Sequence, residues 1–350
     1  MSEFDAPPRS RLGSRTLLAL LLLVLLAAPI PYVRYEPGAT YDTFGSVDGT
    51  RLVTVAKDAQ HPQYKTTGEL RMLTVYEWGG PLGPYTVADA LRSLFDHAIT
   101  LEPVEFVYPT DVSSDDVAEE GRTAFASAQN QAIAAALQEL DIEVTPFVDI
   151  MTVDPKGPAA KFLKDGDSIV SMQGLPVSDI TSLDAVLSTL KPGDELTIEV
   201  TRKGKLRELK FPLGKNDEGK ARIGIFLLQN YKGPMDIKMQ LDNVGGPSAG
   251  LAFALTIYDK LSPGDLLRGR VIAVTGTIEA DGRVGAIGGL HQKFAAAYRA
   301  GARTMLIPWD NCRSIENDIP EGLTVVPVRT LHQAVSLLSR PDSQPLPACP

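Results

Sequence analysis

The sequence predicts a multidomain α+β protein with an N-terminal apolar helix, a β-rich domain in the middle and an α/β domain towards the C-terminus. Three observations indicate this order. A leucine-rich run lies near the N-terminus, strand-like segments separated by Gly and Pro turns fill the middle, and strand and helix patterns mix in the last third. With 350 residues, of which 44% are apolar, the chain can bury two or three hydrophobic cores.

Charge and cysteine content narrow the class of protein. The formal net charge of -9 is dispersed along the chain, and no basic run is interleaved with aromatic residues, so nucleic acid is not expected as a partner. The two cysteines, Cys312 and Cys349, are too few for a disulfide framework and lack metal-ligand spacing, so no cofactor is predicted. A single bridge is not favoured, because Cys349 lies in a Pro-rich tail, residues 341–350, that we expect to be flexible.

The apolar N-terminal segment is interpreted as a transmembrane anchor over residues 16–34. Three arginines precede it within residues 1–15, whereas Arg34 alone follows it. Positive charge is retained on the cytoplasmic side, so residues 1–15 are expected in the cytoplasm and the rest of the chain outside it. The sequence thus predicts a single-pass protein of the cell membrane whose larger part is extracytoplasmic.

A cleavable signal peptide is the alternative for this segment, since its apolar core has a length that suits both. Ala27 and Ala28 are small enough to precede a cleavage site. The next residue is Pro29, which disfavours cleavage there. A retained anchor is therefore the preferred interpretation.

Residues 35–143 are predicted to pack on the two domains that follow. Residues 70–76 have a strand pattern, and residues 87–95 have that of a short helix. The alanine-rich stretch within residues 112–140 has apolar residues at helical spacing and carries acidic residues near its start, which suits the positive end of a helix. We expect this helix to be structural.

Residues 144–215 resemble a bacterial PDZ domain. The order is a strand, a Gly-Pro turn segment, a helix and a final pair of strands, and the matching signatures are Gly157-Pro158-Ala159-Ala160, Asp165-Gly166-Asp167-Ser168-Ile169, Met172-Gln173-Gly174 and Pro192-Gly193-Asp194. A PDZ domain adds an extended peptide to a sheet edge, with backbone amides of a Gly-containing loop holding the terminal carboxylate. Residues 140–143, at the position expected for that loop, contain two acids and no glycine. Capture of a free C-terminus is therefore not expected, and a structural role for this module is the alternative.

The last domain, residues 230–340, contains the strongest motif of the chain. Ser248 follows Gly245, Gly246 and Pro247 and precedes a helical pattern, so it lies at a helix N-terminus, where free amides favour negative charge. Serine is also among the best N-cap residues, and a lone serine at this place would more often be a cap than a nucleophile.

The residues from Gly245 to Pro308 resemble the proteolytic domain of the Lon family, in which the serine of a Pro-Ser-Ala-Gly motif pairs with a lysine. The resemblance implies Ser248 as nucleophile and Lys293 as its base, with Thr275 supporting the lysine. A lysine can accept a proton only when neutral, which requires burial that lowers its pKa. The resemblance implies peptide-bond hydrolysis through an acyl-enzyme, with the oxyanion on backbone amides of the turn from Gly245 to Ser248.

The resemblance also implies protein or peptide substrates and self-association, commonly as a hexameric ring. The chain departs from the family pattern at Thr277 and at His291-Gln292, so substrate selection or subunit contacts are expected to differ. The phosphate-binding pattern GxxxxGK followed by Ser or Thr does not occur, so a peptidase that does not use ATP is predicted. Small membrane-anchored bacterial peptidases of this type that carry a PDZ domain are the most similar class.

Two other functions compete with this interpretation. Residues Gly246 to Gly250 also fit the GxSxG elbow of α/β-hydrolases, with Asp310 and His332 in the order required for a triad, although too few residues follow Ser248 for the rest of that sheet. The second is a non-catalytic adaptor that binds partners through the PDZ-like module.

Overall fold

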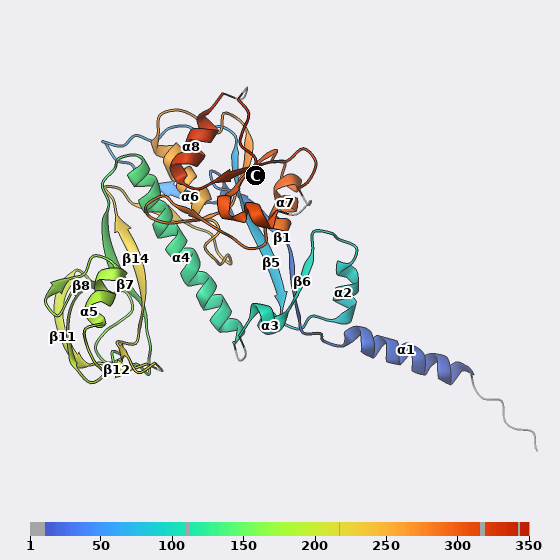
Figure 1. Ribbon diagram of the computed structural model, residues 1–350, viewed down its shortest axis with the longest axis horizontal. Helices are drawn as coiled ribbons and strands as arrows, with labels where there is room; N and C mark the ends of the chain where they lie inside the picture. The colour runs from blue at the N-terminus through green and yellow to red at the C-terminus, as the bar shows by residue number, and fades with distance from the viewer. Residues whose placement is uncertain (1–10, 110–111, 217, 316–318, 342–343, 350) are drawn as a thin grey trace, which may run out of the picture.

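The computed structural model describes residues 11–109, 112–216, 218–315, 319–341 and 344–349. Two sheets dominate it, and the long helix α4 (Ser114–Glu139) lies between them (Figure 1). This helix begins with a capping box in which Ser113 and Asp116 satisfy each other's backbone amides. The sequence therefore predicts the start of α4 to within two residues.

The larger body is built on a six-stranded sheet with the order β20-β19-β16-β5-β1-β6. Strands β16, β19 and β20 come from the C-terminal region and run parallel to one another and to β5. Strand β1 is antiparallel to both β5 and β6. The bounds are β1 (Tyr32–Asp42), β5 (Glu69–Gly79), β6 (Thr100–Pro103), β16 (Val271–Val274), β19 (Thr304–Pro308) and β20 (Thr324–Val328).

This sheet changes the domain division that the sequence predicts. Residues 35–143 were expected to pack on a separate domain of residues 230–340, but three of the six strands lie before residue 104. Parallel pairing between β5 and β16, in the middle of the sheet, joins the two parts of the chain. The larger body therefore contains the N-terminal strands as part of its core.

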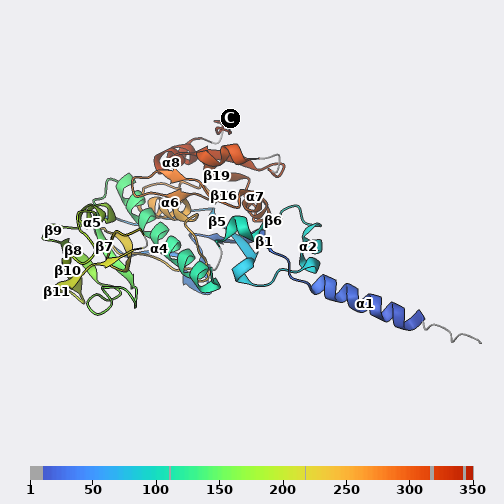
Figure 2. The same ribbon diagram turned by 60° about the horizontal axis from the view of Figure 1, so that its bottom comes forward.

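Helices cover both faces of this sheet (Figure 2). One face carries α4, α6 (Gly250–Leu261) and α8 (Leu331–Ser339), and the other carries α7 (Leu290–Arg299). Side chains alternate between the faces along a strand, so Ile272 and Val274 pack under α6 while Ala273 packs under α7. Burial on both faces explains the continuous apolar runs of the parallel strands.

The smaller body has the sheet order β11-β10-β8-β7-β14, with β9 paired to β8. Its elements are β7 (Thr145–Val153), β8 (Ser168–Met172), β9 (Leu175–Pro176), α5 (Ile180–Leu187), β10 (Glu195–Arg202), β11 (Lys205–Pro212) and β14 (Ile225–Lys232). The sheet extends past residue 215, the predicted C-terminal boundary of this domain. Strand β14 pairs antiparallel with β7 along its whole length and forms the edge of the sheet.

The N-terminal helix is shorter than the predicted segment of residues 16–34. Helix α1 spans Arg11–Ala27, and the next residues leave the helix because Pro29 and Pro31 lack the backbone N–H that it needs. Tyr32 already begins strand β1. None of the helices in the described residues has the length and apolar character required to span a bilayer.

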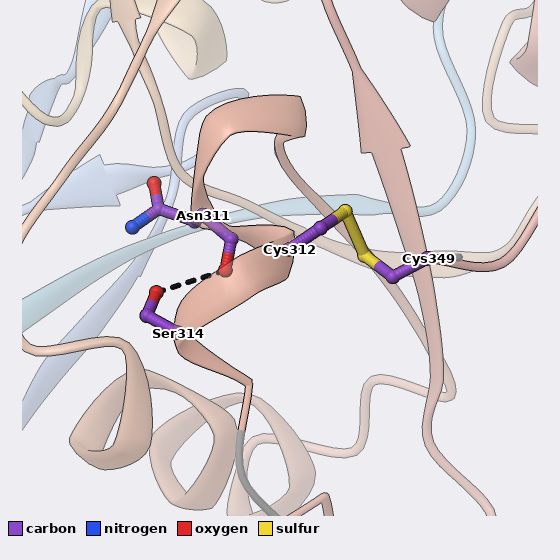
Figure 3. The surroundings of a disulfide bond; sticks show 4 residues. All are labelled: Asn311, Cys312, Ser314 and Cys349. Carbon is purple, nitrogen blue, oxygen red and sulfur yellow. Dashed lines mark hydrogen bonds between the residues drawn. A yellow bond between two sulfur atoms is a disulfide. The ribbon is translucent and has the colours of Figure 1, made fainter.

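The C-terminal tail differs from the expectation of a flexible segment. Cys349 forms a disulfide with Cys312, with Cα atoms 5.4 Å apart (Figure 3). Cys312 lies in the 3₁₀ helix η2 (Trp309–Ser314), and Cys349 packs against the core under α7. The bridge that sequence reasoning did not favour thus ties the tail to the larger body.

The remaining elements are short. They are α2 (Val87–Ser93), α3 (Val104–Val107), η1 (Gly80–Leu82), β2 (Ser46–Val47), β3 (Thr50–Arg51), β4 (Val53–Val55), β12 (Gly214–Lys215), β13 (Ala221–Arg222), β15 (Ile237–Met239), β17 (Thr277–Ile278) and β18 (Val284–Gly285).

Candidate active site

Ser248 and Lys293 lie together although 44 residues separate them in the chain. The Lys293 Nζ atom is 3.0 Å from the Ser248 Oγ atom, which is hydrogen-bonding distance. Ser248 stands just before the Ala249 cap of α6, and that helix end has no side-chain cap. The hydroxyl of Ser248 therefore bonds to the lysine and does not cap the helix.

Helix α7 places Lys293 one turn from its N-terminus. The turn before it needs Gly289, which has a φ of 65° and whose missing Cβ would lie 2.7 Å from the Val75 side chain. Lys293 is 3% exposed, and this burial lowers its pKa to about 8. At that value a substantial fraction of the amine is neutral near physiological pH, as a general base requires.

Thr275 hydrogen-bonds to the loop that carries Ser248 and not to Lys293. Its hydroxyl donates to the main-chain carbonyl of Ser248 at 3.3 Å, and the amide of Gly276 donates to the same oxygen at 2.9 Å. The expected hydrogen bond between Thr275 and Lys293 is not among those of the described residues. The threonine thus holds Ser248 from the main-chain side.

Of the four residues from Gly245 to Ser248, two cannot offer an amide to an oxyanion. The Gly246 amide donates to the carbonyl of Gly121 in α4 at 2.9 Å, so it is already engaged. Pro247 has no N–H to donate. The Gly245 and Ser248 amides have no hydrogen-bond partner among the described residues, and Ser248 carries the nucleophilic oxygen. Its own amide is therefore the better candidate for an oxyanion donor.

An open cleft of about 1180 Å³ surrounds the Ser248–Lys293 pair. The loop before α6 and the loop before α7 form one wall, and side chains of β1, β5 and β6 form the other. The N-terminal strands therefore contribute to the cleft as well as to the sheet. Sequence reasoning missed this contribution to the cleft because the N-terminal strands carry no motif.

One polar cluster in the cleft was not predicted. Glu77 of β5 accepts hydrogen bonds from the hydroxyls of Tyr35, at 3.4 Å, and Tyr108. Burial, together with the Glu77 carboxylate, raises the pKa of both tyrosines well above the ordinary value. Both hydroxyls thus stay protonated and act as donors. Pairing of Tyr35 opposite Glu77 across β1 and β5 creates this cluster, and no local sequence pattern marks it.

Two of the residues that depart from the family pattern, His291 and Gln292, contact the same N-terminal region. The Gln292 amide donates to the Thr100 hydroxyl at 2.8 Å, and the His291 ring bonds to the carbonyl of His97. Gln292 is buried. The α7 residues beside Lys293 are therefore adapted to β6 and the loop before it.

The hydrolase triad does not assemble. His332 lies on α8, where its side chain is 80% exposed and its Nδ1 atom is 2.8 Å from Glu139. Neither His332 nor Asp310 lines the cleft around Ser248. Lys293 occupies the position at which a base would accept the Ser248 proton.

A second, smaller cavity of about 350 Å³ lies between α5 and the start of β14. Leu183 and Leu187 line one side, and Ile225 and Leu227 line the other. Gly224, with a φ of 81°, directly precedes the edge strand β14. Residues 140–143 do not line this cavity; they connect α4 to β7 and place Ile142 against the core of the larger body.

The comparisons with known proteins match two parts of the chain. The family model of the Lon protease (S16) C-terminal proteolytic domain matches residues 243–338, and that of a PDZ domain matches residues 133–213. The chain therefore contains a proteolytic domain of the Lon type and a PDZ domain, and the former is the domain of a serine-type peptidase.

Curated relatives match only the proteolytic region. The chain is 41% identical over 95 residues to the Lon protease of Buchnera aphidicola subsp. Schizaphis graminum and 40% identical over 96 residues to that of Escherichia coli strain K12, in each case 26% of this chain. These regions span 12% of each relative's length. Among solved structures, the PDZ domain of the SdrC-like protein of Listeria monocytogenes is 27% identical, with a TM-score of 0.22, over 23% of this chain and 85% of that one.

Proposed function

We propose that this chain, with its Lon-type proteolytic domain and its PDZ domain, is a serine endopeptidase that cleaves extracytoplasmic or membrane-associated proteins without ATP. One observation carries the proposal. The Lys293 amine lies 3.0 Å from the Ser248 hydroxyl, and the lysine is buried enough to lower its pKa to about 8. A serine with a neutral amine at this distance is an activated nucleophile.

The reaction uses these two side chains in sequence. The Ser248 hydroxyl attacks the scissile carbonyl while the Lys293 amine takes its proton, and the resulting ammonium then protonates the leaving amine. Water next attacks the acyl-enzyme, with Lys293 again accepting a proton, and the Ser248 hydroxyl is restored. Thr275 and Gly276 hold the Ser248 carbonyl, which keeps the hydroxyl directed at the lysine.

The PDZ domain is proposed to bind an extended peptide along the free edge of β14, beside α5. Apolar side chains of both elements line this groove, and Gly224, just before the start of β14, lines it as well. Extended peptides with apolar side chains are the expected ligands. Phe226→Asp, at a 60% exposed position beside the groove, should weaken their binding, whereas Leu206→Asp at a similarly exposed position on β11 should not.

ATP is proposed to be unnecessary, and this can be measured directly. Degradation of an unfolded protein such as casein should proceed at the same rate with and without ATP and Mg²⁺. A rate that depends on added nucleotide would contradict this part of the proposal.

Membrane anchoring through α1, with the N-terminus in the cytoplasm, is proposed as well. The helix exposes its leucines, for example Leu18 at 68% and Leu23 at 67%. Phe95, just after α2, and Phe106, in α3, are also exposed, at 89% and 79%, and backbone hydrogen bonds tie residues 28 and 31 to the first residues of α2 and α3. Release of the full chain from membranes by alkaline carbonate would contradict anchoring.

Assembly into a homo-oligomer, with a hexameric ring as the expected form, rests on the resemblance alone. Light scattering on the chain purified in detergent measures the mass of the assembly. A monomer at concentrations where the peptidase is fully active would remove this part of the proposal.

The experiment that tests the activity is digestion of casein, together with labelling by a serine-directed fluorophosphonate. Ser248→Ala and Lys293→Ala should each lower the rate at least 10³-fold, as is usual for a nucleophile and its base. Ser262→Ala, at the other end of α6, and His332→Ala serve as controls that should retain activity. Intact casein with the wild-type chain and all variants would favour the adaptor function instead.

The pH dependence gives a second test of the same pair. Activity requires neutral Lys293, so kcat/KM should rise with pH and level off above a midpoint of about 8. Because the burial of the lysine causes the shift, a midpoint close to the ordinary lysine value of 10.5 would mean that another group is the base.

A further inference from the structure

The loop that carries Ser248 is held by helix α4 as well as by its own domain. Thr275 and Gly276 hold the Ser248 carbonyl from one side. From the other side, the Gly121 carbonyl of α4 accepts the amide of Gly246 at 2.9 Å. The loop is thus clamped between the sheet and α4 on either side of the nucleophile.

The two main chains approach closely here, so a side chain at Gly245 would be crowded and only a small one fits at Gly121. A Cβ added to Gly245 would lie 3.1 Å from the Gly121 Cα atom, and one added to Gly121 would lie 3.5 Å from the Gly245 Cα atom. Glycine is a poor residue inside a helix, yet Gly121 stands within α4, a helix of 26 residues. The close approach of the two main chains is the reason for it. A carbonyl has two lone pairs, so Gly121 can serve its own helix and the loop together.

Helix α4 is well placed to hold the loop steady. Its Phe125 packs edge-to-face on Phe253 of α6, the helix that begins after Ser248, with ring centroids 5.8 Å apart. Further along, the side chain of Asn130 hydrogen-bonds to Asn230 of β14 in the PDZ domain. Gly121 lies outside both segments that match a known family, residues 133–213 and 243–338.

We propose that Gly121 is a positioning residue for the peptidase reaction: its carbonyl fixes the Gly246 amide and so leaves the amide of Ser248 directed at the substrate's oxyanion. The proposal rests on the peptidase function given above. The Gly246 amide is engaged and Pro247 has no amide, so the Ser248 amide is the donor next to the nucleophile. Displacement of the loop would move this donor, and with it the Ser248 hydroxyl, whereas Lys293 stays in place because it belongs to α7.

The test compares three variants of the full chain. Gly121→Val forces its branched side chain against Gly245, whereas the single methyl group of Gly121→Ala fits at ordinary contact distance. Ala118→Val places the same valine on the exposed side of α4, one turn earlier. Valine is no worse than glycine as a helix former, so α4 itself should stay folded in all three.

Gly121→Val should lower kcat at least tenfold with KM within twofold of wild type, because loss of an oxyanion donor affects the transition state more than the bound substrate. The pH midpoint near 8 and the unfolding temperature should match those of Ala118→Val. Gly121→Ala should retain most of the activity. An unchanged kcat, or a loss explained by a lower unfolding temperature, would overturn the proposal.

Hydrogen exchange measures the contact without any need for activity. In the wild type the amide of Gly246 should be protected, and Gly121→Val should make peptides covering residues 242–247 exchange at least tenfold faster, while Ala118→Val leaves them unchanged. Equal exchange in all variants means that the contact is absent and the proposal fails, whatever the peptidase does. Faster exchange with no Ser248-dependent hydrolysis in the wild type means that the proposed function fails, and the positioning role with it.

Discussion

The two sheets of the molecule are assembled in different ways. The PDZ sheet takes all its strands from one stretch of chain, residues 145–232, whereas the proteolytic sheet takes three strands from residues 32–103 and three from residues 271–328. A sheet made of neighbouring segments can fold as a unit, since loop closure costs little. The proteolytic sheet instead needs two distant parts of the chain, and its cleft is lined by both.

Truncation is expected to separate the two sheets most strongly, because one fragment should fold and the other should not. A fragment of residues 141–232 should unfold cooperatively, because it contains every strand of its sheet and its own core. A fragment of residues 233–340 should not fold, because β16 loses β5 as its partner and the apolar faces under α6 and α7 are left open. Circular dichroism during thermal unfolding checks both. A cooperative transition in the second fragment would show that the N-terminal strands are dispensable.

A buried ion pair allows the PDZ domain to be weakened by itself. Asp167 is fully buried and accepts two hydrogen bonds from the guanidinium of Arg202, at 2.7 and 2.6 Å. Arg202→Met leaves this carboxylate without its charged partner, which should destabilise the domain by about 3 to 5 kcal/mol. Chemical denaturation should then show an earlier PDZ transition.

The control for this variant is the other body. Fluorophosphonate labelling of Ser248 should persist after the PDZ domain of Arg202→Met has unfolded. Loss of labelling in the same transition would mean that the two sheets unfold together and that α4 couples them tightly.

The buried Lys293 makes the proteolytic body less stable at low pH. Lys293 has a pKa of about 8 when folded and 10.5 as the ordinary value, so the unfolded chain binds more protons between these values and stability rises with pH there. Below pH 8 the full penalty applies, roughly 3 kcal/mol. Lys293→Met should therefore be more stable than wild type at pH 7, and the gain should vanish as the pH approaches 10.5. Urea unfolding at pH 7 and 10 measures this, and an equal difference at both pH values would refute it.

Removal of the disulfide is expected to change the stability least. It links residues 37 apart, and a crosslink of this kind stabilises mainly by restricting the unfolded chain. Cys349→Ser should lower the stability of the larger body by about 2 kcal/mol and leave the PDZ transition unchanged. Reduction of the wild type should have the same effect, and a shift of the PDZ transition would contradict the separation of the two bodies.

Local patterns predicted the elements that they encode. Strand β5 and helices α2 and α4 were all expected within a few residues of where they lie, because their turns, charges and apolar periodicity are written in adjacent positions. Strand β1 was missed, since part of it was assigned to the apolar N-terminal segment. Strand β14 was left outside its domain because its pairing partner β7 lies more than 70 residues earlier.

The sequence by itself was enough to pair Ser248 with Lys293, because the residues around both resemble the Lon proteolytic domain. Only the tertiary structure decided what surrounds the pair. The carbonyl of Gly121 engages the Gly246 amide, Thr275 holds Ser248 in place of the lysine, and Glu77 meets two tyrosines across strands. The physical reason is that main-chain hydrogen bonds and cross-strand neighbours depend on which distant segments pack together, and no side-chain pattern along the chain records that.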